Sequence, residues 1–328
     1  MALPTLAGTR SILSVSFRPA APAAAARRLL SSSGDGGGGG GPLRPVALQL
    51  DYYLSAQFAG VAVAERQGLY AARGVRLALL PDCPVGEEAR SVRARQDAHP
   101  EALAVGTVEQ NVLVPVLAKD PSLKMTAVAA MFQESPLGLA ALPGNAVLSE
   151  PQRAGLRVGA HEDTADLLRA LLPAAEVVAC HRDDKMGALR RGEIDAVQVY
   201  DLMETAMLAG EAAAAGRPAP AFVPLADLGA QLGYSQVIFA PTDALKDAAK
   251  IELLKDFLAA TFDGWQLARA LPAAAADDVE ALMAARGVVA DHWPAGDRAF
   301  TAETVAQCCE RVVAAAGPAA ALGRRVLA

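Results

Sequence analysis

Residues 43–80 read LRPVALQLDYYLSAQFAGVAVAERQGLYAARGVRLALL. A β-strand is predicted over residues 43–50, where apolar side chains alternate with others. A helix is predicted over residues 57–70, with Gly68 near its end as a residue typical of helix C-termini. A second strand is predicted over residues 75–80. Strand, helix and strand in this order are typical of an α/β fold.

The same alternation continues along the chain. Further strands are predicted over residues 102–106, 125–132, 137–142, 156–160, 177–180, 194–199 and 237–240. Further helices are predicted over residues 87–99, 108–118, 164–172 and 185–191, and several more between residue 242 and the end.

The order of these elements predicts two lobes. Residues 138–233 contain a complete alternation of their own, after which the chain returns to the first unit. We therefore predict a two-lobed α/β fold, with residues 43–137 plus 234–328 as lobe 1 and 138–233 as lobe 2. Each lobe is expected to be a mainly parallel sheet flanked by helices, with the ligand cleft between the lobes at the carboxyl ends of the strands.

Composition excludes several classes of function. The chain has 328 residues with 53% hydrophobic and 20% charged residues, enough for two lobes with cores of their own. Its net charge of -6 argues against a general nucleic-acid binder. The four cysteines form no CxxC pair and have no histidine at metal spacing, so reduced thiols and no metal site are expected. No apolar run is long enough to span a membrane.

The first residues differ in composition from the rest. Residues 1–34 contain four arginines and no acidic residue, which is typical of an organellar transit peptide. The run from Arg27 to Ser32 resembles the surroundings of a mitochondrial processing site, so a mitochondrial location is expected, with a plastid as the alternative. Residues 35–42 form a Gly-rich linker.

Four groups of residues carry a resemblance to a known family. The first group runs through Leu50-Asp51-Tyr52-Tyr53, Gly60, the segment from Ala64 to Tyr70, and Gly74-Val75. The others are the segment from Gly192 to Val197 followed by Tyr200 and Glu204, then Gly233-Tyr234-Ser235, and the segment from Phe257 to Trp265. In order and spacing they resemble the type II solute-binding proteins, and within them the SsuA/thiamine-pyrimidine (NMT1/THI5-like) family. The resemblance covers about residues 45–285 and is nearest to the thiamine-pyrimidine binding proteins.

The resemblance fails at the residues that the family's iron-dependent pyrimidine synthase needs. That synthase carries a lysine that holds pyridoxal phosphate, a sacrificial histidine and a cysteine cluster. The loop from Gly106 to Asn111, where the lysine and histidine should stand, has neither, Phe58 stands where another histidine is expected, and no cysteine-rich run exists. The resemblance therefore implies a binding protein without cofactor, metal or catalytic residues, although an enzyme stays open.

Acidic and aromatic residues stand at the strand ends and loops that are expected to face the cleft. The candidate ligand-binding residues are Asp51, Tyr52, Gln133, Glu134, Tyr200, Glu204 and Tyr234. A carboxylate can accept two parallel hydrogen bonds from an aminopyrimidine, and an aromatic ring can stack on it. An anionic ligand is disfavoured, because Glu162 and Asp163 occupy the predicted helix N-terminus.

Several of these residues have a structural alternative. Glu204 is the first candidate for the amino face of a pyrimidine, whereas Asp51 equally fits an ordered loop. Gln133 and Glu134 alternatively tie the backbone where the chain crosses between lobes. Asp163 or Thr164 is predicted to cap a helix, and His161 to be structural. The helix that begins at Lys185 is predicted to be a solvated face.

The predicted function is the binding of a thiamine-precursor aminopyrimidine, or a close analogue, in thiamine biosynthesis or salvage. A transporter or an enzyme of the thiamine pathway is the expected partner. Two alternatives stay open. One is a diverged pyrimidine synthase or other aminopyrimidine-processing enzyme, with Glu134 or Glu204 as general base. The other is a sulfonate- or nitrate-type binder.

Overall fold

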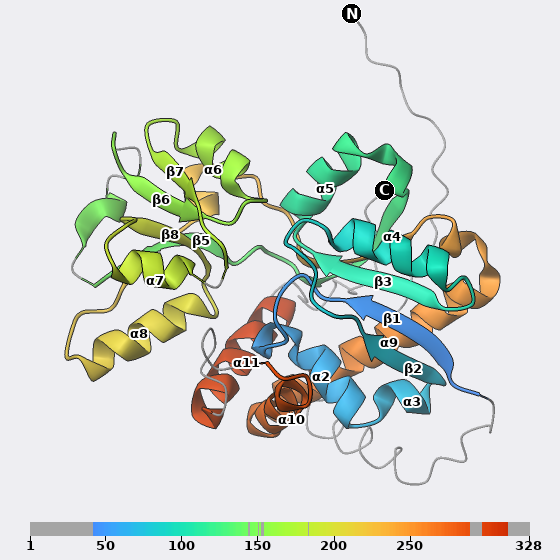
Figure 1. Ribbon diagram of the computed structural model, residues 1–328. Helices are drawn as coiled ribbons and strands as arrows, with labels where there is room; N and C mark the ends of the chain where they lie inside the picture. Colours follow the sequence, from blue (N-terminus) through green and yellow to red (C-terminus); the bar gives the residue numbers. More distant parts are fainter. Residues whose placement is uncertain are drawn as a thin grey trace, which may run out of the picture.

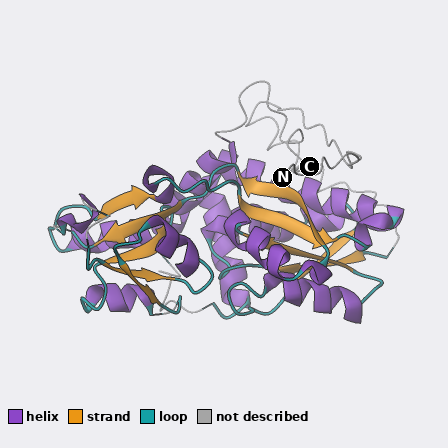
Figure 2. Cartoon of the chain, turned by 90° about the horizontal axis from the view of Figure 1, so that it is seen from above, coloured by secondary structure: helices purple, strands orange, loops and turns teal. Residues whose placement is uncertain are grey.

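Two five-stranded sheets flanked by helices make up the fold (Figure 1). The structure is a computed structural model that describes residues 42–143, 145–149, 151, 154–182, 184–288 and 297–313. The expected leader, residues 1–34, and the expected linker, except for Pro42, lie outside the described residues. Seen from above in Figure 2, the two groups of strands stand apart, and helices surround each of them.

The first sheet has the strand order β2-β1-β3-β10-β4. Its strands are β1 (Arg44–Gln49), β2 (Val75–Leu79), β3 (Leu103–Val108), β4 (Met125–Phe132) and β10 (Ser235–Pro241). The second sheet has the order β7-β6-β8-β5-β9. Its strands are β5 (Leu137–Ala141), β6 (Arg157–Ala160), β7 (Glu176–Ala179), β8 (Ala196–Tyr200) and β9 (Ala221–Pro224).

The predicted fold class is confirmed, but each sheet is mixed instead of mainly parallel. Strand β1 runs parallel to β2 and β3, and β6 runs parallel to β7 and β8. In contrast, β10 is antiparallel to β3 and β4, and β5 is antiparallel to β8 and β9. Strand β5 is the first strand after the chain enters the second sheet, and β10 is the first strand after it returns to the first sheet. Each of them runs antiparallel to its two neighbours.

The predicted helices are present, but one of them is broken, and the helix over residues 204–214 has no counterpart among the predicted helices. They are α2 (Ala59–Arg66), α3 (Leu69–Ala72), α4 (Glu88–Ala98), α5 (Gln110–Lys119), α6 (Ala165–Leu171), α7 (Lys185–Arg190), α8 (Glu204–Ala214), α9 (Ala248–Ala270), α10 (Pro272–Ala285) and α11 (Arg298–Val313). The single helix expected over residues 57–70 is broken at Gly68, whose φ of 70° is left-handed. Strand β9 has no counterpart among the predicted strands, because this short edge strand ends in a proline and is half-buried throughout.

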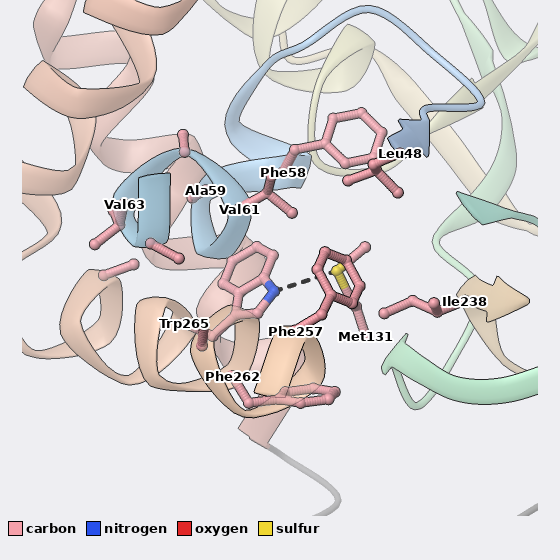
Figure 3. Close-up of a cluster of buried hydrophobic side chains, with 14 of the residues drawn as sticks. Leu48, Phe58, Ala59, Val61, Val63, Met131, Ile238, Phe257, Phe262 and Trp265 are labelled. Carbon is pink, nitrogen blue, oxygen red and sulfur yellow. Dashed lines mark hydrogen bonds between the residues drawn. The ribbon is translucent and has the colours of Figure 1, made fainter. Parts of the chain in front are cut away.

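The core of the first lobe depends on a close contact between α2 and α9 (Figure 3). A Cβ atom at Gly264 would lie 2.0 Å from the carbonyl oxygen of Gly60, and one at Gly60 would lie 2.2 Å from Trp265 Cδ1. The Trp265 indole nitrogen donates to Met131 Sδ at 3.4 Å, as the dashed line in Figure 3 marks. Gly60, Gly264 and Trp265 therefore serve the close packing of α2 against α9.

The two lobes are in direct contact. Leu202 and Met203, which follow β8 of the second sheet, are buried in the apolar core of the first lobe. Arg311 of α11 lies 2.7 Å from Asp201 in an ion pair. Within the described residues, no helix combines the length and the apolar character needed to cross a membrane.

Candidate functional site

A cavity lies between the two lobes. Its empty volume is about 560 Å³, part of which is open to solvent. Four of the seven predicted site residues line it, namely Asp51, Tyr52, Tyr200 and Glu204. Asp51 and Tyr52 follow β1, and Tyr200 and Glu204 lie at the end of β8. The predicted location at the carboxyl ends of central strands thus holds for these four residues.

The other three predicted residues lie elsewhere. Gln133 and Glu134 line a separate hollow beside Arg311 of α11. They follow β4, an edge strand of the first sheet that packs beside α11, and so they do not reach the ends of β1 and β3. Tyr234 does not line the cavity, and its backbone N–H donates to Gln110 Oε1 at 3.0 Å. Glu134 therefore does not reach the cavity as a general base.

Asp51 is held in place by side chains from two neighbouring strands. Thr107 donates its hydroxyl to Asp51 Oδ1 at 2.7 Å, and Gln236 Nε2 donates to Oδ2 at 3.3 Å. Gln236 has a left-handed φ of 51°, a conformation of the kind that concentrates at functional sites. Burial, with a smaller contribution from the charge of Asp163, raises the pKa of Asp51 to about 6. The sequence predicts that Asp51 either binds the ligand or orders a loop. The structure gives it the hydrogen bonds of a loop-ordering residue and also places it in the cavity lining.

Glu109 lies at the point where the chain crosses between the lobes, and it is not among the residues predicted from the sequence. Its carboxylate accepts hydrogen bonds from the hydroxyl groups of Ser235 and Ser135, the latter at 3.2 Å. Ser135 lies on the passage from β4 to β5, and Ser235 begins β10 at the end of the return passage. Burial, followed by the charge of Asp51, raises the pKa of Glu109 to about 8. Its place directly after β3, beside Thr107, is the sequence signal that could have found it.

Glu88 and Asp163 add two more carboxyl groups to the cavity. Burial raises the pKa of Glu88 to about 8, and burial also raises the pKa of Asp163. Thr164 is the N-cap residue of α6, as expected, although its side chain makes no hydrogen bond to the first turn of the helix. Its hydroxyl instead donates to Asp163 Oδ1 at 3.1 Å. Together with Asp51 and Glu109, Glu88 and Asp163 make four carboxyl groups from four chain segments that line the cavity in addition to Glu204.

Lys185 is expected on a solvated helix face, and this is wrong. Its Nζ lies 2.6 Å from Glu204 Oε1, with side-chain exposures of 3% and 8%. Lys185 also donates to the Gln198 carbonyl oxygen at 3.2 Å, and Glu204 Oε2 accepts from the Tyr200 backbone N–H at 3.0 Å. Glu204 thus lines the cavity with both oxygens already bound to protein. Lys185 begins α7 at the wall of the cavity and is buried there against Glu204.

Aromatic and cationic side chains of opposite lobes meet beside the cavity. The rings of Tyr52 and His161 are stacked, with centroids 6.2 Å apart. The Arg182 guanidinium lies 4.0 Å from the centroid of the Tyr53 ring and 3.5 Å from Asp82 Oδ2. Burial, followed by the charges of Lys185 and Arg182, lowers the pKa of His161 well below its usual value, and so the imidazole is neutral at neutral pH.

Two buried side-chain polar atoms of residues that line the cavity have no protein partner among the described residues. They are Nε2 of Gln57 and Nε2 of His161, and both residues line the cavity. Gln57 is only 1% exposed. Buried polar groups of this kind are normally bonded to water or to a ligand. No group of three or more His, Cys, Asp and Glu side chains in the described part of the chain has the geometry of a metal site.

Solved structures show which class of protein this fold belongs to. The chain is similar to the ligand-binding component of an ABC-type import system from Staphylococcus aureus, with 11% identity and a TM-score of 0.54 over 83% of this chain and 91% of that one. It is similar to the aliphatic sulphonate binding protein SsuA of Escherichia coli, with 16% identity and a TM-score of 0.51 over 78% and 84%. The nitrate-binding protein NrtA of Synechocystis PCC 6803 matches with 9% identity and a TM-score of 0.51 over 73% and 66%. The fold is that of a type II solute-binding protein.

The family follows from the sequence itself. Residues 55–275 match the family described as NMT1/THI5 like, and the chain therefore belongs to that family. None of the curated proteins matches the chain. Family and fold together define a small-molecule-binding protein of the NMT1/THI5-like type.

Proposed function

We propose that the chain binds an aminopyrimidine of the thiamine-precursor type, or a close analogue, in thiamine biosynthesis or salvage. The observation that carries the proposal is the lining of the cavity, where the rings of Tyr52 and Tyr200 stand beside the buried carboxyl groups of Asp51 and Glu109. Flat aromatic walls suit a flat heterocycle, and carboxyl oxygens suit its amino group and ring N–H.

The environment of Lys185 supports this choice over an anionic ligand. A sulfonate or nitrate requires an uncommitted cation or free N–H donors. Lys185 is the only Lys or Arg side chain among the described residues that line the cavity, and it is already paired with Glu204. The remaining charged groups of the lining are acidic, so an anion would meet repulsion there.

The positions of the synthase residues support binding over synthesis. Phe58, at the position where the synthase histidine is expected, is fully buried in the core and does not line the cavity. In the segment from Gly106 to Asn111, where the synthase has its lysine, the ionisable side chain that lines the cavity is that of Glu109. The proposed role is therefore capture of the pyrimidine for a transporter or a thiamine-pathway enzyme.

Calorimetry decides between these ligands. We expect 4-amino-5-hydroxymethyl-2-methylpyrimidine to bind with one-to-one stoichiometry, and taurine, nitrate and pyridoxal phosphate to give no saturable heat. An Asp51→Asn variant should bind the pyrimidine more weakly by about 1.5–3 kcal/mol, the usual loss for a charge-assisted hydrogen bond. A Glu134→Gln variant is the matched control outside the cavity. Saturable binding of an anion, without binding of the pyrimidine, would refute the proposal.

A further inference from the structure

Besides the paired Glu204, four carboxyl groups from four separate segments line the cavity. Asp51 follows β1, Glu88 begins α4, Glu109 follows β3 and Asp163 precedes α6. Each of these carboxyl groups is withdrawn from water by burial. Four buried carboxyl groups that line one cavity cannot all stay negatively charged unless protons or a cation compensate them.

The cationic side chains nearby are already committed to other partners. Lys185 forms the ion pair with Glu204 and donates to the Gln198 carbonyl. Arg182 lies over the Tyr53 ring and beside Asp82. Among the described residues, the carboxyl cluster of Asp51, Glu88, Glu109 and Asp163 therefore has no cation of its own in the cavity lining.

We propose that the ligand binds as an organic cation and that its positive charge lies among the side chains of this carboxyl cluster. The proposal deepens the proposed function and rests on it for the identity of the ring. An aminopyrimidine protonated on its ring, or one that carries an ammonium group, has the required charge. The chemical class is thus a cationic nitrogen heterocycle.

Uncharged groups of the cavity define the rest of the ligand. The buried amide of Gln57 has a donor without a protein partner, which calls for an acceptor atom on the ligand. The aromatic rings of Tyr52 and Tyr200 line the same space, and aromatic faces attract cations. The expected ligand therefore combines a positive end, a flat ring and one hydrogen-bond acceptor.

Proton release follows from this arrangement. Burial keeps protons on Glu88 and Glu109 at neutral pH, since each has a pKa of about 8 in the empty cavity. A bound cation lowers both pKa values, so protons leave for the solvent as the ligand enters. The other groups that face the cluster change little, because His161 stays neutral and Lys185 and Glu204 neutralise each other.

Calorimetry with three probes tests the inference. The probes are 4-amino-5-hydroxymethyl-2-methylpyrimidine, its 5-aminomethyl analogue, which carries an ammonium group at neutral pH, and benzyltrimethylammonium. We expect the aminomethyl compound to bind at least about tenfold more tightly than the hydroxymethyl compound. Its heat of binding should differ between phosphate and Tris buffer, and the sign of this difference should show that the protein releases protons to the buffer.

Variants assign the effect to the cluster. Glu88→Gln keeps an oxygen that can accept from the Gly86 N–H but loses the titrating carboxyl, so it should reduce both the tenfold preference and the proton release. Glu134→Gln, the same substitution outside the cavity, should change neither. Equal preference and equal proton release in Glu88→Gln and wild type would overturn the inference.

The outcomes separate this inference from the proposed function. If the hydroxymethyl compound binds, and the aminomethyl compound binds no more tightly and releases no protons, the cationic ligand is refuted and pyrimidine binding stands. If benzyltrimethylammonium binds with proton release while neither pyrimidine binds, the cationic ligand stands and pyrimidine binding is refuted. If neither cationic probe binds, the inference is overturned.

Discussion

Lys185 Nζ and Glu204 Oε1 lie 2.6 Å apart in a part of the second lobe from which water is largely excluded. The two residues begin α7 and α8, helices that flank the same sheet. Glu204 also accepts the backbone N–H of Tyr200 at the end of β8, so the pair fixes one wall of the cavity. The lysine that could have attracted an anionic ligand is neutralised by this pair.

Removing one partner of this pair should destabilise the protein. Glu204→Gln leaves the buried ammonium of Lys185 without a counter-charge, which typically costs about 3–5 kcal/mol of the free energy of unfolding. Denaturant unfolding of Glu204→Gln measures the loss, and the exposed pair of Arg190 and Glu211 offers Glu211→Gln as control, with a change below about 1 kcal/mol. Equal stability of the two variants would contradict the prediction.

The contact between α2 and α9 should tolerate no side chain at Gly60. Gly60→Ala places a Cβ 2.2 Å from Trp265 Cδ1, and overpacking of this kind costs about 1–3 kcal/mol or more. Gly210→Ala is the matched control, because Gly210 lies in α8 and a Cβ added to it would meet no atom within 4 Å. That control should be neutral or stabilising by up to about 1 kcal/mol. Thermal unfolding of both variants gives the comparison, and a stable Gly60→Ala would disprove the packing argument.

Stability should decrease as the pH rises from about 5 to 8. Asp51, Glu88 and Glu109 have raised pKa values of about 6, 8 and 8, so the folded state binds more protons than the unfolded state in this range. The stabilising contribution is complete below the unfolded pKa and is lost as pH passes the folded pKa. The slope is up to about 1.4 kcal/mol per pH unit for each proton. Urea unfolding at several pH values measures it.

Glu88→Gln should flatten that pH profile by up to one proton, because the amide does not titrate while its oxygen still accepts from the Gly86 N–H. Glu134→Gln should keep the wild-type slope, as this exposed residue lies outside the carboxyl cluster. A wild-type protein whose stability increases steadily from pH 5 to 8 would show that the cluster is ionised in the folded state.

Arg182 should hold the lobes together. It comes from the second lobe and lies 4.0 Å from the Tyr53 ring centroid and 3.5 Å from Asp82 Oδ2, both in the first lobe. Arg182→Ala should reduce the preference for the closed arrangement by about 0.5–2 kcal/mol and increase the radius of gyration in small-angle scattering. Arg169→Ala removes an exposed arginine that pairs within its own helix and should leave the radius unchanged. Identical scattering of both variants would exclude a closing role.

The acid-free residues 1–34 are proposed to direct import into an organelle and to be removed there. Residues 1–45 fused to a fluorescent reporter should send it to mitochondria, with a shortened fusion protein on a gel. Replacing the four arginines by glutamine should keep the reporter in the cytosol. A wild-type fusion that stays cytosolic or is secreted would refute the proposal.

Local patterns are sufficient for the fold class and for part of the site. Alternating strands and helices predict two α/β lobes, and the end of β1 correctly predicts Asp51 and Tyr52 in the cavity. Gly60 and the segment from Phe257 to Trp265 stand out as motifs, and the structure gives their reason, which is close helix packing. The alternation of strands and helices depends on neighbours in sequence, which a single chain reveals.

The tertiary structure alone decided which polar side chains share the cavity. In the sequence Lys185 looks like one of several surface cations, and only the meeting of α7 and α8 shows that it is buried against Glu204. Glu109 gains its role from two serines that are 26 and 126 residues away in sequence. Gln133 and Glu134 stand at a strand end like Asp51 but face another hollow, because their strand lies at the edge of the sheet. Burial and charge pairing arise from contacts distant in sequence, and so no local pattern encodes them.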